Sequence, residues 1–128
     1  MNNFKLERLA FPLSKLGHVR KSQKPPRHKS GEQFLKGPVP LRWLCLAAKQ
    51  PGKALHVGVA LWYLAGMRRK RTVPLTNVVL GKFGVDRSAK LRGLRSLEAV
   101  GLISVHRKPN RNPEVTIVEV RGEPHEQG

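Results

Sequence analysis

The sequence predicts a mainly α-helical domain that ends in a small antiparallel β-hairpin. Apolar residues recur at helical spacing in four segments between residues 41 and 100. Two β-branched runs follow, at residues 102–107 and 114–120, and a proline-containing loop separates them. With 128 residues, the chain has room for one domain with a modest core and for polar extensions.

The charge of the chain is strongly unbalanced. It has 25 Lys+Arg against 8 Asp+Glu, a formal net charge of +17. A compact fold with this charge repels itself, so a polyanion is the expected partner. The Pro, Lys, Ser and Gln content of residues 1–36 predicts a basic, flexible N-terminal arm, which either contacts phosphates or the minor groove or only keeps the protein in solution. We expect a folded domain over residues 37–121 and a disordered tail over residues 122–128.

The first two predicted helices supply much of the apolar surface. Residues 41–50 form one helix, and Pro51 and Gly52 follow its end. Residues 53–67 form a longer helix that is apolar around most of its circumference. Such a helix needs burial on more than one side, so it either lies at the centre of the domain or offers a face to another subunit. The four consecutive cations after it, residues 68–71, are either a solvated connector or phosphate contacts.

A short helix, a tight turn and a longer helix are predicted next. Thr76 or Asn77 can cap a helix that runs to residue 83, because a short polar side chain accepts a free backbone N–H of the first turn. Gly84 ends this helix, since glycine tolerates the left-handed conformation that stops a helix. Asp86 then caps the following helix.

That following helix, residues 87–100, carries the predicted binding face. Leu91, Leu94 and Leu97 recur three apart and define its buried side. The opposite side carries small and basic residues, namely Ser88, Arg92, Arg95, Ser96 and Ala99. Small neighbours let a helix approach a groove closely, and arginine can pair with guanine or contact phosphate. Two cations nearer the buried side are expected to reach sideways to phosphates or solvent: Arg87 and Lys90. The alternative is a solvated basic face.

A basic hairpin closes the domain. Between its two strands the prolines and asparagines of residues 107–113 form a projecting loop, because they favour turns and cannot continue a strand ladder. Its polar and basic residues suit contact with a phosphate backbone or a minor groove. They are Arg107, Lys108, Asn110 and Arg111. The alternative is an ordinary exposed hairpin. Residues 72–75 can add a short third strand to it.

Catalytic and metal-binding patterns are missing from the sequence. The five histidines are scattered, with no Cys/His ligand set, and no glycine-rich phosphate loop or acid pair stands in a suitable context. Cys45 is expected to be a buried small side chain, and His56 a partly buried packing or capping residue. No apolar stretch is long enough to span a membrane, and no signal-peptide pattern opens the chain. We expect no enzyme activity, cofactor, metal or small-molecule ligand.

The order of short helix, turn, basic helix and basic hairpin is that of a winged helix-turn-helix. The run from Val85 to Ile117 resembles the recognition helix and wing of bacterial winged helix-turn-helix proteins of the MarR-like kind. The residues that carry the resemblance are Leu97, Glu98, Gly101, Leu102 and Ile103. The resemblance covers about residues 34–120. The chain departs from MarR-like regulators in lacking a long C-terminal dimerisation helix, which leaves their dimer architecture open here.

The resemblance and the charge together predict a sequence-specific double-stranded DNA-binding protein. A cytoplasmic, nucleoid-associated transcriptional regulator is expected, with the helix of residues 87–100 in a major groove and the loop of residues 107–113 on the flanking backbone or minor groove. Thr76 and Asn77 add phosphate contacts. A homodimer is favoured, because one recognition helix covers few base pairs. The alternatives are a plasmid or mobile-element replication or partition factor, an RNA-binding or ribosome-associated protein, and a protein-interaction module.

Overall fold

The computed structural model describes residues 23–120. Its contacts divide the chain into two units, with the boundary between Gln33 and Phe34. The described part of the first unit contains a turn in which the Glu32 backbone N–H donates to the Lys29 carbonyl at 2.9 Å. The predicted tail over residues 122–128, and the first 22 residues of the predicted arm, lie outside the described residues.

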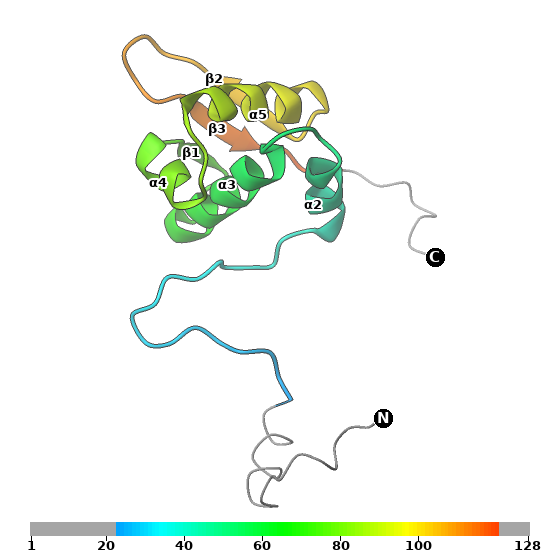
Figure 1. Ribbon diagram of the computed structural model, residues 1–128, viewed down its shortest axis with the longest axis vertical. Helices are drawn as coiled ribbons and strands as arrows, with labels where there is room; N and C mark the ends of the chain where they lie inside the picture. Colours follow the sequence, from blue (N-terminus) through cyan, green and yellow to red (C-terminus); the bar gives the residue numbers. More distant parts are fainter. Residues whose placement is uncertain (1–22, 121–128) are drawn as a thin grey trace, which may run out of the picture. The chain divides into compact units, whose positions relative to one another are not determined.

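The described part of the second unit contains four helices and a small three-stranded antiparallel sheet, shown in Figure 1. The helices are α2 (Leu41–Ala48), α3 (Ala54–Arg68), α4 (Asn77–Lys82) and α5 (Arg87–Ala99). The strands are β1 (Thr72–Pro74), β2 (Ile103–His106) and β3 (Glu114–Ile117). The prediction of a mainly α-helical domain with a small antiparallel sheet is therefore confirmed.

The sheet has the order β1-β3-β2, so the last strand lies between the other two. The register places Val115 of β3 opposite Val73 on one side and Val105 on the other. Thr72 and Thr116 also face each other, and their hydroxyl oxygens are 2.8 Å apart. The predicted third strand is thus present, and it fixes the end of α3 against the hairpin.

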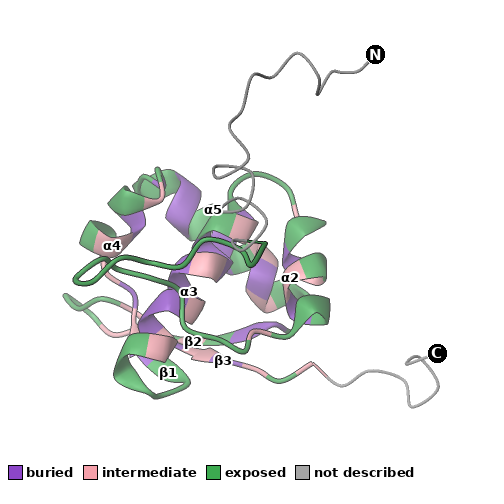
Figure 2. Ribbon diagram, turned by 90° about the horizontal axis from the view of Figure 1, so that it is seen from below, coloured by how far each residue is buried: buried purple, intermediate pink, exposed green. Residues whose placement is uncertain are grey.

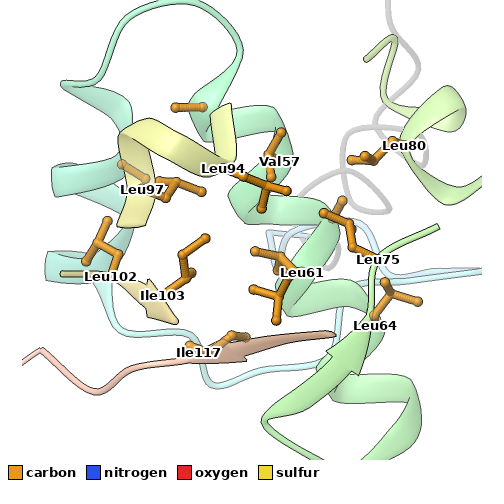
Figure 3. Packing of buried hydrophobic residues seen from close by; sticks show 14 of the residues in the cluster. Val57, Leu61, Leu64, Leu75, Leu80, Leu94, Leu97, Leu102, Ile103 and Ile117 are labelled. Carbon is orange, nitrogen blue, oxygen red and sulfur yellow. The ribbon is translucent and has the colours of Figure 1, made fainter. Parts of the chain in front are cut away.

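Helix α3 lies at the centre of this unit and contacts α2, α4, α5, β1 and β3. Figure 2 shows buried residues along α3, and Figure 3 shows Val57 and Leu61 of this helix among side chains from α5 and the sheet. This apolar helix was predicted either to lie at the centre of the domain or to offer a face to another subunit, and it lies at the centre. Gly93 of α5 permits the close approach, because a Cβ atom there would lie 2.8 Å from Cγ2 of Val57.

Helix α2 covers a second side of α3 and is held through its tryptophan. The Trp43 indole is 1% exposed, and its N–H donates to the Leu102 carbonyl at 3.2 Å. The Trp43 and Trp62 rings meet edge to face, with centroids 5.7 Å apart. This places α2 against the start of the hairpin.

Three expectations about burial were wrong. Cys45 is exposed because it lies two positions from the buried Trp43 and Ala47, which places it on the far side of α2. His56 is also exposed, although its neighbour Val57 is fully buried. Leu91, expected in the buried stripe of α5, is 51% exposed.

Candidate functional site

Two side-chain caps position α4 and α5. Thr76 Oγ1 accepts from the Val79 backbone N–H at 3.2 Å, and Asp86 Oδ1 accepts from the Ala89 N–H at 2.8 Å. Asp86 was predicted as a cap, and Thr76 was one of the two residues predicted for the other cap, so the structure confirms Asp86 and selects Thr76 over Asn77. Gly84 between the helices has φ +72°, the left-handed conformation predicted for it, and Val85 beside it is buried.

A third contact to this turn was not predicted. The Lys53 ammonium group donates to the Gly84 carbonyl at 2.6 Å and so ties the turn to the start of α3. The two residues are 31 positions apart. Sequence spacing gives no signal for such a pair, because only the tertiary arrangement brings them together.

The outward side of α5 matches the predicted binding face at four of its five residues. Ser88, Arg92, Arg95 and Ala99 are exposed, and Ser96 is partly buried. The buried side holds Ala89, Gly93, Leu94 and Leu97, together with Lys90. The exposed Leu91 joins the outward side, so this face is basic and polar with one large apolar side chain.

Lys90 requires a correction, because it does not reach outward to phosphate or solvent. It is 7% exposed, and its ammonium group donates to the Leu75 carbonyl at 3.1 Å and to Asn77 Oδ1 at 2.9 Å. Burial lowers the pKa of this ammonium group below its usual value, and the nearby Arg87 guanidinium adds to the shift. Lys90 therefore links α5 to the start of α4 from inside the domain.

The loop between β2 and β3 projects from the sheet, as Figure 1 shows. Asn110 lies at its turn with φ +59°. Two of its cations lie near carboxylates. Arg107 Nη2 is 3.5 Å from Glu98 Oε1, and Lys108 Nζ is 3.8 Å from Glu114 Oε2. Both ion pairs are at the surface, since all four side chains are at least one third exposed. Arg111 is exposed near the tip.

The first half of α5 and this loop enclose a cavity of about 480 Å³, which we call the basic groove. It brings together seven of the residues predicted for the site: Asn77, Arg87, Ser88, Lys90, Arg107, Lys108 and Arg111. Residues more than 30 positions apart in the sequence therefore share one concave surface. Five predicted residues do not line it, namely Thr76, Arg92, Arg95, Ser96 and Asn110. Arg92 and Arg95 are also on α5, but they are not among the residues that line the groove.

A larger cavity, of about 610 Å³, lies between the start of α2, the end of α3 and the end of β3. Its lining includes two aromatic residues, Trp43 and Trp62, and four cations, Lys36, Arg69, Lys70 and Arg71. Within the described part of the chain, the buried Trp62 indole N–H has no hydrogen-bond partner. Both cavities are lined by cations, but only the basic groove joins the predicted face of α5 to the predicted loop, and we therefore take it as the candidate functional site.

The described residues contain no group of His, Cys, Asp and Glu side chains that could hold a metal ion. Over the same part of the chain, no helix has the length and apolar character needed to cross a membrane. The chemistry on offer at the basic groove is hydrogen bonding and charge pairing by guanidinium, ammonium, hydroxyl and amide groups. These groups bind anions and the edges of nucleic-acid bases.

Comparisons with known proteins give no relative from which a function could be transferred. No protein-family model, no curated protein and no solved structure matches the chain.

Proposed function

We propose that the protein binds double-stranded DNA sequence-specifically through a winged helix-turn-helix and regulates transcription. The order α3-β1-α4-α5-β2-β3, with β3 between β1 and β2, supports this fold. One observation carries the function. Arg87 and Ser88 on α5 share the basic groove with Lys108 and Arg111 of the β2–β3 loop. A basic helix beside a basic loop suits two adjacent features of one duplex.

In this proposal α5 enters a major groove with its outward side. Ser88, Arg92 and Arg95 are exposed there. An arginine can donate two hydrogen bonds to guanine O6 and N7, and a serine hydroxyl can bond to several base edges. Small residues such as Ala99 leave room for the wall of the DNA major groove.

The β2–β3 loop then holds the flanking backbone or minor groove. Arg111 is exposed at the tip and available for a phosphate. Arg107 and Lys108 would exchange their carboxylates for phosphates, which is feasible because exposed ion pairs contribute only about 0–1 kcal/mol. Asn77, held by Lys90 at the start of α4, adds a further polar group at the same groove.

The test is selection of bound duplexes from a random pool, followed by affinity measurements on the selected sequence. We expect an enriched sequence, and a palindrome would also indicate a homodimer. Arg92→Ala should relax preference at one base pair and cost about 1–3 kcal/mol on the selected duplex. Arg111→Ala should weaken selected and random duplexes about equally, because a phosphate contact carries no base information.

A charge-matched control separates base reading from loss of positive charge. Lys49→Ala removes one cation outside α5 and the basic groove, and Lys49 is exposed. It should leave base preference unchanged. Structured RNA competes poorly in this proposal, since the A-form major groove is too narrow for a helix. No enrichment, together with strong RNA competition, would replace the proposal with an RNA-binding function.

A further inference from the structure

Leu91 is a large apolar side chain at an exposed position on α5. It is 51% exposed, whereas Leu94 and Leu97 on the same helix are 1% and 0% exposed. Its place on the helix is therefore not explained by the core. A single exposed leucine needs no explanation by itself, but Leu91 lies on the outward side of α5 and lines the basic groove, so a ligand bound there would cover it. Covering a leucine is favourable.

The surroundings of Leu91 are polar and cationic. Residues three and four positions away are neighbours on a helix, and for Leu91 these include Arg87, Ser88 and Arg95, all exposed. Leu91 also lines the basic groove. An apolar protein partner would have to cover these exposed positive charges, so charge complementarity favours a polyanion that offers an apolar group of its own.

Duplex DNA has such a group in its major groove. Thymine carries a C5-methyl group there, the apolar feature by which it differs from the other bases on that edge. Phosphates on both sides of the groove complement the cations around Leu91. Contact between a leucine and a thymine methyl excludes water from both apolar surfaces.

We propose that Leu91 is a specificity-determining residue that contacts a thymine methyl group in the bound duplex. The inference rests on the proposed function and adds a particular base to it. Arginine pairs favour guanine, and Leu91 favours thymine, so the bound sequence combines the two. The selected sequence therefore contains at least one thymine whose methyl group matters for affinity.

The test replaces thymine by uracil, one position at a time, in the duplex selected by the wild-type protein. Uracil keeps the hydrogen-bonding groups and lacks only the methyl group. We expect about a fourfold loss of affinity at one thymine, the effect of one buried methyl group. For Leu91→Ala and Leu91→Gln the thymine and uracil duplexes should bind equally. Leu91→Gln keeps a side chain of similar length, so it distinguishes lost apolar contact from lost bulk.

Leu41→Ala provides the matched control. Leu41 is an exposed leucine of α2, 73% exposed, and lies outside the basic groove. It should retain the full preference for thymine over uracil. Circular dichroism should show the same helix content in all variants, since neither leucine is in the core.

The two proposals fail in different ways. Equal binding of thymine and uracil duplexes by the wild-type protein, or a selected sequence without thymine, overturns the role of Leu91 and leaves duplex binding intact. Retained preference for thymine in both Leu91 variants also overturns it. Absence of any selected duplex overturns the proposed function itself.

Discussion

Lys90 lines the basic groove, but its ammonium group is already held by hydrogen bonds within the domain. Its ammonium group lies between the Leu75 carbonyl and Asn77 Oδ1, so it connects the end of β1, the start of α4 and the interior of α5. Hydrogen bonds offset part of the cost of burying a charged group. Lys90 acts on the proposed site by positioning α4 and Asn77.

Replacing Lys90 by methionine tests this positioning role. Lys90→Met leaves the buried Leu75 carbonyl without this donor, and we expect the free energy of unfolding at pH 7 to fall by about 1–3 kcal/mol. The pKa of Lys90 is lowered from its usual value of 10.5 by burial and by Arg87. Between the lowered pKa and 10.5 the unfolded chain therefore binds a proton on Lys90 that the folded chain has lost. Stability due to Lys90 rises with pH across that window.

Urea denaturation of both proteins at several pH values measures the effect. The wild-type advantage over Lys90→Met should grow as the pH rises towards 10.5. Comparing the two proteins at each pH cancels the titration of the other groups. An advantage that shrinks over the same range would contradict a buried, destabilised ammonium group.

At the scale of whole elements, Gly93 sets how closely α5 packs against α3. Gly93→Ala would place a Cβ atom 2.8 Å from Val57 Cγ2 and 3.5 Å from the Ala54 Cα atom. Alanine favours a helix over glycine by up to about 1 kcal/mol. Overpacking costs about 1–3 kcal/mol, so the net effect should be a loss of stability.

Gly81→Ala is the control for helix propensity. Gly81 lies in α4, and a Cβ atom there meets nothing within 4 Å. This variant should therefore gain about 0.5–1 kcal/mol. Thermal denaturation compares the two variants with the wild type. A Gly93→Ala protein that gains as much as Gly81→Ala would mean that α3 and α5 separate easily.

Local rules predicted the turn between α4 and α5 because its signals lie within a few residues. Thr76 and Asp86 cap the helices, and Gly84 takes a positive φ, all from chemistry that depends on neighbours in sequence. Helical spacing also predicted that Leu94 and Leu97 are buried. The same rule failed for Leu91, which is exposed at one edge of the buried stripe. It placed Lys90 nearer the buried side but gave no sign of its hydrogen bonds to Leu75 and Asn77. Which edge is covered depends on where α4 and the end of β1 pack, and periodicity does not contain that information.

The sequence predicted many residues of the candidate site, but it did not predict how they share one concave surface. Seven of the predicted residues meet at the basic groove because the β2–β3 hairpin brings its loop back beside α5. The carboxylate neighbours of Arg107 and Lys108 were missed, although Glu114 begins the adjacent strand. Ion pairing across a hairpin depends on its register, which the sequence fixes only loosely when the loop length is uncertain.

At the scale of the whole molecule, a formal net charge of +17 makes salt the main control of the proposed interaction. Each phosphate neutralised by the protein releases condensed counterions. If roughly six to ten phosphates are neutralised, affinity for duplex DNA should fall by about 10³ to 10⁵ between 50 and 200 mM salt. Fluorescence anisotropy of a labelled duplex over this range measures the slope.

The contribution of the β2–β3 loop to this salt dependence can be measured with a double variant. Lys108→Ala combined with Arg111→Ala should reduce the slope by about two, one for each lost phosphate contact, whereas Lys49→Ala should leave it unchanged. Base preference should persist in the double variant, because the outward side of α5 is intact. If instead the slope stays at the wild-type value while affinity falls, the loop acts by holding α5 in place rather than by contacting phosphate. A weak slope in the wild-type protein would remove the electrostatic basis of duplex binding altogether.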